Sequence, residues 1–143
     1  MIQGLGVDTV EIERIGRVMG RWPGFLERIL TERERAEVGH AVHRVAARWA
    51  AKEALFKALD LPAKGLALSW REIEVRNTST GRPFFSLSGK IAGLVRRRGW
   101  RLHLSLSHDR ERATAVVLVE KMPRSRRGMA WGYKSKRRSS LWN

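Results

Sequence analysis

Residues 42–57 give the strongest helix signal in the chain, and this helix constrains the fold more than any other segment. The segment contains no glycine or proline, is rich in alanine and places its charges at helical spacing. At about 100° per residue, six of its apolar residues share one face roughly 140° wide. They are Val42, Val45, Ala46, Trp49, Ala50 and Phe56. Glu53 falls inside this stripe, and a carboxylate facing a core is costly unless a cation, a metal or hydrogen bonds compensate it.

Two interpretations of Glu53 stay open at this point. Lys57 lies one turn further on, at the margin of the apolar face. The two residues could form an ordinary i,i+4 ion pair, worth about 0.2–0.5 kcal/mol on a solvated helix. Alternatively, the carboxylate is held at the core for chemistry and acts together with Lys57. In both cases a positive charge is expected close to Glu53.

The other segments alternate between strand and helix signals. Thr31–Glu34 matches a capping box, in which a hydroxyl and a carboxylate satisfy free amides at the start of a helix. Gly39 is the position at which the long helix that follows could break. The expected strands are 2–10, 69–76, 82–87, 100–107 and 113–119. The expected helices are 11–20, 25–30, 32–60 and 88–98, the last one capped by Ser88 and stopped by Gly99.

The second half of the chain predicts the fold class. Residues 100–107 alternate between Trp or Leu and Arg, His or Ser, which is the period of a strand with one buried face. His108 follows on the apolar side. The later strands are joined by one hairpin loop, at 77–81, and by one helix. This order favours an α+β fold in which the long helix packs on a mainly antiparallel sheet.

Composition limits the cellular compartments in which the protein is expected and the side chains that could bind a metal. The 143 residues fit one domain, and no apolar run approaches the roughly 18 residues of a membrane span. The N-terminus lacks the basic and apolar regions of a signal peptide. The chain has no cysteine, so a metal would need oxygen or imidazole ligands. We therefore expect a cytoplasmic protein.

The net charge of +15 is unevenly distributed. Residues 122–143 hold seven Lys or Arg and no acid, with no hydrophobic period. We predict a folded domain at 1–121 followed by a disordered basic tail at 122–143. The preceding 121 residues still carry 22 bases against 14 acids, which favours an anionic partner such as nucleic acid, a phosphorylated cofactor or an acidic protein.

Several residues could carry chemistry, and each also has a structural interpretation. Asp8, near the end of the first strand, either caps the next helix or pairs with Glu53. Two carboxylates with no cysteine or histidine cluster would suit Mg²⁺, which keeps several waters and also binds substrate phosphates. His108 is either a satisfied structural imidazole or a ligand-binding group, and 81–83 is foremost a turn signal. A solvated helix face is the simplest interpretation of Arg14, Arg17 and Arg21.

Three motifs occur in a fixed order along the chain. They are Gly6-Val7-Asp8 followed by Glu11-Ile12 and Arg14, then Trp49-Ala50-Ala51-Lys52-Glu53-Ala54-Leu55-Phe56-Lys57, then Ser105-Leu106-Ser107-His108. Together they resemble the 4′-phosphopantetheinyl transferases. The chain length and the N-terminal position of the first motif fit the short bacterial type, and the resemblance extends to about residue 120.

This resemblance implies a fold, a reaction and a set of site residues. The implied reaction moves phosphopantetheine from coenzyme A to a serine of apo acyl carrier protein and releases 3′,5′-ADP. The implied fold is a pseudo-ferredoxin-like α+β domain that forms a homotrimer, with coenzyme A between subunits. Asp8 and Glu53 would hold Mg²⁺ on the pyrophosphate, and Lys57 would neutralise or protonate the leaving phosphate, so Glu53 and Lys57 are the catalytic candidates. The implied coenzyme A site consists of Arg48, Lys57, Gly81, Arg82, Pro83 and His108. The implied carrier-protein face consists of Arg14, Arg17 and Arg21.

Two features depart from the family pattern, and two other functions remain to be weighed. Residues 60–65, Asp-Leu-Pro-Ala-Lys-Gly, stand where the family usually has a glycine-rich turn, and the tail has no counterpart. One alternative is a small basic nucleic-acid-binding protein, in which the tail grips phosphates and its Trp and Tyr residues stack on bases. The other alternative is a trimeric scaffold whose transferase site has decayed. The basic charge does not explain an acid inside an apolar helix face, and the altered loop near Pro62 is the only support for the scaffold, so the transferase is the favoured hypothesis.

Overall fold

The computed structural model describes residues 1–61 and 68–121. The predicted tail and most of the departing loop at 60–65 lie outside the described residues. In chain order the elements are β1 (Ile2–Glu11), α1 (Ile12–Arg21), α2 (Phe25–Ile29), α3 (Glu32–Val38), α4 (Val42–Ala58), the 3₁₀ turn η1 (Trp70–Glu72), β2 (Ile73–Asn77), β3 (Pro83–Leu87), α5 (Gly89–Arg98), β4 (Trp100–His108) and β5 (Arg112–Lys121).

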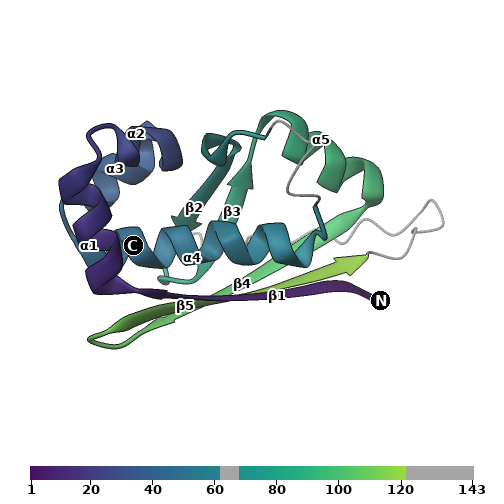
Figure 1. Ribbon diagram of the computed structural model, residues 1–143. Coiled ribbons are helices and arrows are strands. Elements are labelled where there is room, and N and C mark those ends of the chain that lie inside the picture. Colours follow the sequence, from purple (N-terminus) through teal and green to yellow (C-terminus); the bar gives the residue numbers. More distant parts are fainter. Residues whose placement is uncertain (62–67, 122–143) are drawn as a thin grey trace, which may run out of the picture.

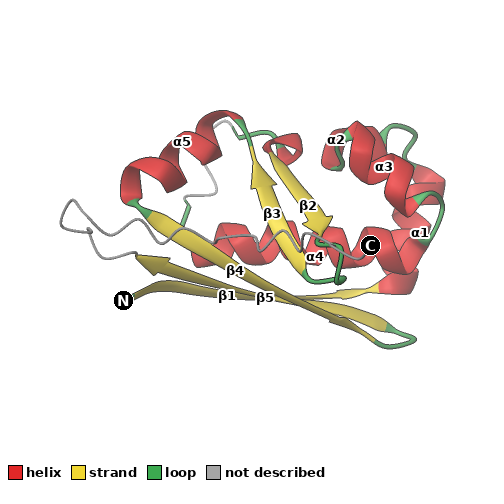
Figure 2. Cartoon of the chain, turned by 180° about the vertical axis from the view of Figure 1, so that it is seen from behind, coloured by secondary structure: helices red, strands yellow, loops and turns green. Residues whose placement is uncertain are grey.

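The strands form two antiparallel groups, and α4 crosses the larger one. The three-stranded sheet has the order β1-β5-β4, while β2 and β3 form a separate hairpin. Helix α4 lies on the inner face of β1 and β5, with α1 to α3 gathered at one end of it and α5 at the other (Figure 1). The view from behind shows the hairpin on the same side of the sheet as α4 (Figure 2). The predicted α+β class with a mainly antiparallel sheet is confirmed.

Two glycines let β1 approach α4 unusually closely. A Cβ added at Gly4 would overlap the carbonyl oxygen of Ala58, and one added at Gly6 would overlap that of Ala54. Only glycine fits a backbone at this separation. The facing surface of α4 is accordingly made of small residues, since Ala51, Ala54 and Ala58 are all buried. This close approach fixes where Asp8, two residues further along β1, meets α4.

The α4 face predicted from the sequence is only partly right. Val45, Ala46 and Ala50 are fully buried, but Val42, Trp49 and Phe56 are half-buried. The most deeply buried side of α4 is the one that carries the alanines facing β1. Large apolar residues dominate a hydrophobicity pattern, whereas close helix–strand contact selects small ones, so the predicted stripe is rotated from the true buried face.

Several element boundaries also differ from prediction. The long helix predicted at 32–60 breaks at Gly39, the position at which the sequence allowed a break. Gly39 ends α3 with φ 55. Residues 69–72 are not strand. Trp70–Glu72 form a 3₁₀ turn, and Ser69 caps it, because its Oγ accepts a hydrogen bond from the Arg71 amide at 3.3 Å. Ser88 precedes α5 without capping it; instead the Glu72 carboxylate accepts from the Ile91 amide at 3.2 Å.

The core contains an ion pair that the sequence analysis missed. Lys52 and Glu34 are both completely buried, and the Lys52 Nζ lies 2.7 Å from Oε2 of Glu34. Nζ also donates to the carbonyl oxygens of Ile29 at 2.6 Å and Trp70 at 3.1 Å. Burial lowers the pKa of Lys52, and the Glu34 carboxylate opposes this shift. The pair ties α4 to the start of α3 and to the segment that leads into β2.

Candidate active site

Asp8 and Glu53 come from distant parts of the chain and line the same cavity. Asp8 lies on β1 and Glu53 on α4, and the cavity between α1 and α4 that they share has a volume of about 600 Å³. Trp49 and Phe25 form part of its apolar wall, and Arg14 adds a cation. The structure thus brings the two predicted carboxylates to one cavity.

The electrostatics of Glu53 reflect this convergence. Partial burial raises the pKa of Glu53, and the negative charge of Asp8 raises it further, while Lys57 acts in the opposite direction. Glu53 is neither fully buried in the core nor freely solvated. Two carboxylates so placed repel each other and favour a cation between them. The carboxylates of Asp8, Glu11 and Glu53 outnumber the cations Arg14 and Lys57, so the protein groups alone leave the site short of positive charge.

Lys57 binds Asp8 rather than Glu53. Its Nζ donates to Oδ1 of Asp8 at 2.7 Å and to the carbonyl oxygen of Val7 at 3.2 Å. The side chain of Asp8 is 15% exposed, whereas that of Lys57 is 54% exposed. The ordinary i,i+4 pair between Glu53 and Lys57 is not found among the described residues, and Asp8 does not cap α1, whose N-cap residue is Glu11.

A second cavity, of about 550 Å³, contains two of the predicted coenzyme A residues. Arg48 and His108 line it together with His43, Arg44 and Glu37. The rings of His43 and His108 pack with their centroids 5.2 Å apart. Sequence reasoning missed His43, Arg44 and Glu37, because none of them lies in a recognisable motif. His43 and Arg44 carried only the signal of a basic or titratable side chain within two turns of Arg48, whereas Glu37 lies 11 residues before Arg48 on another helix and carried none.

The other predicted coenzyme A residues lie elsewhere on the same chain. Arg82 and Pro83 line a third cavity, of about 300 Å³, with Arg101 and His103 of β4. Gly81 stands in the turn of the β2–β3 hairpin with φ 85, which confirms the turn signal. The single chain therefore does not bring Gly81, Arg82 and Pro83 into the cavity of Arg48 and His108. One link exists, because Asn77, which lines that cavity, pairs with Pro83 across the hairpin.

The three arginines predicted to face a carrier protein all lie on or at the end of α1. Arg14 lines the cavity of Asp8 and Glu53. Arg17 forms an i,i+4 ion pair with Glu13 at 2.8 Å, and Arg21 is exposed in the last turn. Trp22, directly after the helix, is 65% exposed. The solvated-face interpretation holds for Arg17 and Arg21, while Arg14 reaches the candidate site.

The donor set suits a hard divalent cation with few protein ligands. Asp8 and Glu53 offer carboxylate oxygens, and Lys57 alone does not balance both charges. No cluster of three or more metal-ligating residues occurs within 1–61 and 68–121. Mg²⁺ is commonly bound by one or two carboxylates, with waters and substrate phosphates completing its coordination. The residues present therefore fit Mg²⁺, and an all-protein metal cage is not built here.

Comparison with known proteins identifies the family of the chain. Residues 4–117 match the 4′-phosphopantetheinyl transferase superfamily. The chain is 48% identical over 134 residues to a holo-[acyl-carrier-protein] synthase from Paramagnetospirillum magneticum, covering 86% of this chain and 99% of the relative. No helix of the described ranges is long and apolar enough to cross a membrane.

Solved structures give the same relationship. The holo-[acyl-carrier-protein] synthase from Neisseria meningitidis superimposes with a TM-score of 0.76 at 35% identity, covering 85% of this chain and all of that chain. The Bacillus anthracis enzyme of the same name, in complex with coenzyme A (3′,5′-ADP), gives a TM-score of 0.70 at 37% identity, covering 85% of this chain and 99% of that one. The chain belongs to the 4′-phosphopantetheinyl transferase superfamily.

Proposed function

We propose that this protein is a holo-[acyl-carrier-protein] synthase, which transfers 4′-phosphopantetheine from coenzyme A to a serine of apo acyl carrier protein and releases 3′,5′-ADP. The observation that carries the proposal is the convergence of Asp8 and Glu53 on one cavity, with Lys57 bound to Asp8. These residues lie within the matched segment 4–117. Two relatives, 48% and 42% identical to this chain, carry the same name, and a solved structure 37% identical to it is a complex with coenzyme A.

The reaction needs negative charge to be stabilised where a pyrophosphate is split. The serine hydroxyl oxygen attacks the phosphorus that bears the pantetheine arm, and its proton passes to a water or a carboxylate of the cavity. The bond from that phosphorus to the bridging oxygen breaks, and 3′,5′-ADP leaves with that oxygen. Charge then accumulates on the leaving phosphate. We assign the neutralisation of that phosphate to Lys57, whose ammonium group binds Asp8 and whose side chain is half exposed. The chain needs no nucleophile of its own, because the serine belongs to the partner.

We assign Asp8 and Glu53 as the protein ligands of Mg²⁺. The raised pKa of Glu53, caused by burial and by Asp8, supports a site that favours a cation. Bound there, Mg²⁺ would withdraw negative charge from the pyrophosphate oxygens. The protein's own contribution is to hold the two carboxylates together through the β1–α4 contact and to keep Lys57 beside them.

We assign Arg48 and His108, with Lys57, Gly81, Arg82 and Pro83, to the binding of coenzyme A. Arg48 and His108 line one cavity and Arg82 and Pro83 another, and both cavities are rich in cationic side chains. Such surroundings suit phosphate groups. A homotrimer in which the hairpin of one subunit meets the Arg48 cavity of the next would bring the two sets together on one ligand.

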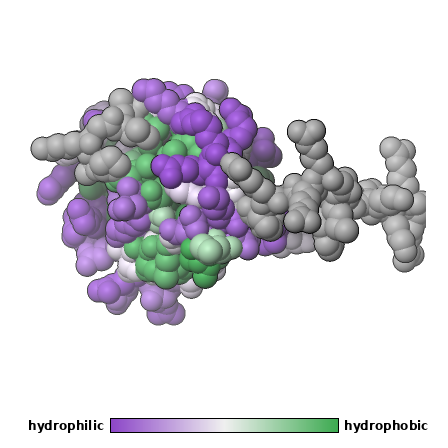
Figure 3. Space-filling view, turned by 90° about the vertical axis from the view of Figure 1, so that its right-hand side faces the viewer, coloured by the Kyte–Doolittle hydropathy of each residue, from purple (hydrophilic) through white to green (hydrophobic). Residues whose placement is uncertain are grey.

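The outer face of the sheet supports such an assembly. On this face Leu5 is 61% exposed, Val7 48% and Val116 38%, and Leu118 pairs with Leu5 across the strands. Figure 3 shows a hydrophobic patch, framed by hydrophilic side chains, toward the bottom of the described surface, the side on which Figure 1 draws β1 and β5. Exposed apolar side chains on neighbouring strands favour burial against another protein surface. A second and third copy of this chain would supply that surface.

The carrier protein would bind along α1. Arg14 lines the cavity of Asp8 and Glu53, while Arg17 and Arg21 extend the positive face away from it. An acidic carrier helix lying on this face would bring its serine toward the two carboxylates. Charge complementarity of this kind chiefly accelerates association.

A mass measurement tests the proposal. The protein is incubated with apo acyl carrier protein, coenzyme A and Mg²⁺, and the carrier is expected to gain the mass of one phosphopantetheine. Glu53→Gln should abolish this gain while leaving the circular dichroism spectrum unchanged. Absence of transfer by the folded wild-type protein would contradict the function, and full transfer by Glu53→Gln would contradict the site.

A further inference from the structure

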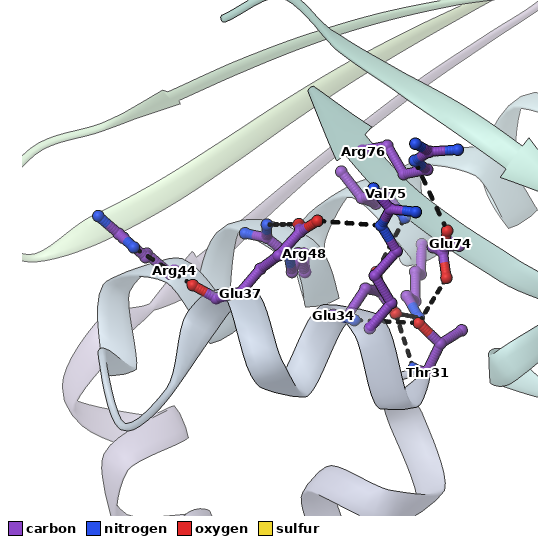
Figure 4. Close-up of polar contacts among 10 residues, drawn as sticks. Thr31, Glu34, Glu37, Arg44, Arg48, Glu74, Val75 and Arg76 are labelled. Atoms are coloured by element: carbon purple, nitrogen blue, oxygen red, sulfur yellow. Dashed lines mark hydrogen bonds and ion pairs between the residues drawn. The ribbon is translucent and has the colours of Figure 1, made fainter. Parts of the chain in front are cut away.

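Two ion pairs join α3 to α4 about one turn apart, and they differ in how completely they are satisfied. The inner pair is Glu34–Lys52. The outer pair is Glu37–Arg48, and Figure 4 shows its two residues near Glu34. In the inner pair, three acceptors surround the Lys52 Nζ. Glu34 in turn accepts from the Thr31 amide through Oε2 and from the Val75 amide through Oε1, both at 2.9 Å. The Lys52 ammonium group and both carboxylate oxygens of Glu34 thus have hydrogen-bond partners within the protein, and the pair acts as part of the core.

The outer pair is incomplete. The side chain of Arg48 is only 10% exposed, and its Nη2 lies 3.3 Å from Oε2 of Glu37. Charge-assisted hydrogen bonds of this type are usually about 2.7–2.9 Å long. The Arg48 Nε is buried and has no hydrogen-bond partner among the described residues. The buried guanidinium of Arg48 thus has one long contact with a carboxylate. It can therefore still donate hydrogen bonds to an anion.

Glu37 lines the same cavity as Arg48, which we assign to the binding of coenzyme A. Both residues line the 550 Å³ cavity, together with His43, Arg44 and His108. Glu37 is also held from two other directions. Its Oε1 accepts from the Arg33 Nε at 3.2 Å, and its carbonyl oxygen accepts from Nη1 of Arg44 at 3.3 Å. The Arg33 contact would therefore keep the carboxylate in the cavity when Arg48 turns to a phosphate, while the Arg44 contact holds only the backbone of Glu37.

We propose that Glu37 is an internal counter-anion of Arg48 that a phosphate group of the substrate must compete with. The inference rests on the proposed function, because the competing phosphate belongs to coenzyme A or to the product 3′,5′-ADP. In the free protein Glu37 keeps the buried guanidinium ordered and partly neutralised. With ligand bound, its negative charge remains beside the phosphate and weakens binding, which favours release of the product.

Isothermal titration of 3′,5′-ADP into the full-length protein tests this role. Glu37→Gln retains an oxygen that can accept from Arg48 but removes the charge. We expect the variant to bind 3′,5′-ADP about three- to tenfold more tightly than wild type at low salt, with the KM for coenzyme A falling in parallel. The difference should shrink at about 0.5 M salt, where charges are screened. Glu32→Gln, which removes an exposed carboxylate from the same helix outside the cavity, should leave both constants unchanged.

The outcomes separate this inference from the function on which it rests. Tighter binding by Glu37→Gln alone supports the counter-anion role. Unchanged or weaker binding by that variant, while wild type binds 3′,5′-ADP and modifies the carrier, would overturn it and reduce Glu37 to a residue that only orients Arg48. A wild-type protein that neither binds 3′,5′-ADP nor transfers would overturn both proposals.

Discussion

The backbone of Gly6 lies against the carbonyl oxygen of Ala54, so that β1 and α4 touch without an intervening side chain. This contact sets the distance between the strand that carries Asp8 and the helix that carries Glu53 and Lys57. The geometry of the candidate site thus depends on a residue that has no chemistry of its own.

Gly6→Ala should therefore damage both stability and activity. A methyl group at this position forces β1 away from α4, and overpacking of this kind costs typically 1–3 kcal/mol. We expect chemical denaturation to show a loss of about that size, and transfer activity to fall further than the loss of folded protein explains. Gly20→Ala is the control, because a Cβ at Gly20 meets nothing within 4 Å, and it should not destabilise the protein. Equal stability of the two variants would contradict the close contact.

The buried pair of Lys52 and Glu34 predicts a large effect from one substitution. Lys52→Met removes the cation and leaves a carboxylate in the core that is still bound only by amides. Breaking a buried pair in this way costs about 3–5 kcal/mol. Arg17→Met breaks an exposed pair with Glu13 and should cost less than about 1 kcal/mol. Urea denaturation of both variants measures the contrast, and a small loss for Lys52→Met would show that the pair is not essential to folding.

The sequence predicted features whose causes are local. The capping box at 31–34 is present, with the Thr31 hydroxyl accepting from the Glu34 amide at 3.1 Å. Gly39 and Gly99 end helices with positive φ, and residues 100–108 form the alternating strand. Each of these features depends on residues that are close together in the sequence, so a single stretch of sequence contains the whole signal.

Most side-chain partners that lie far apart in the sequence were missed or misplaced; the meeting of Asp8 and Glu53, which the motifs had suggested, is the exception. Lys57 contacts Asp8 across 49 positions, and Lys52 contacts Glu34 across 18. Lys52 did carry a signal, since it lies seven residues after Val45 and three before Leu55 and so shares their buried face. The true orientation of α4 could not be read from hydrophobicity, because it is fixed by the glycines of β1.

The raised pKa of Glu53 predicts a pH dependence of the metal-free protein. Burial, reinforced by Asp8, makes the folded state hold this proton more tightly than the unfolded chain does. The stability contributed by Glu53 is therefore lost as pH rises from the ordinary glutamate pKa through the raised value. Thermal unfolding in EDTA should show this loss in wild type but not in Glu53→Gln.

Mg²⁺ should reverse that loss. The cation and the proton compete for the same carboxylate, so stabilisation by millimolar Mg²⁺ should grow with pH over the same range. Glu53→Gln should show little stabilisation by Mg²⁺ at any pH. A Mg²⁺ effect that is independent of pH, or equal in the variant, would place the metal elsewhere.

The exposed sheet face predicts the behaviour of Val116→Glu. Val116 lies on the central strand β5, pairs with Val7, and is 38% exposed in the single chain, so a glutamate there is tolerated by the monomer fold. In a homotrimer that buries this face, three new carboxylates would lose their hydration and repel one another. Sedimentation velocity should then show monomers. If coenzyme A is bound between subunits, transfer activity should fall in the same variant. Ala36→Glu adds the same charge at an exposed position of α3 and should leave the oligomeric state unchanged. A trimer that survives Val116→Glu would show that subunits associate through another surface.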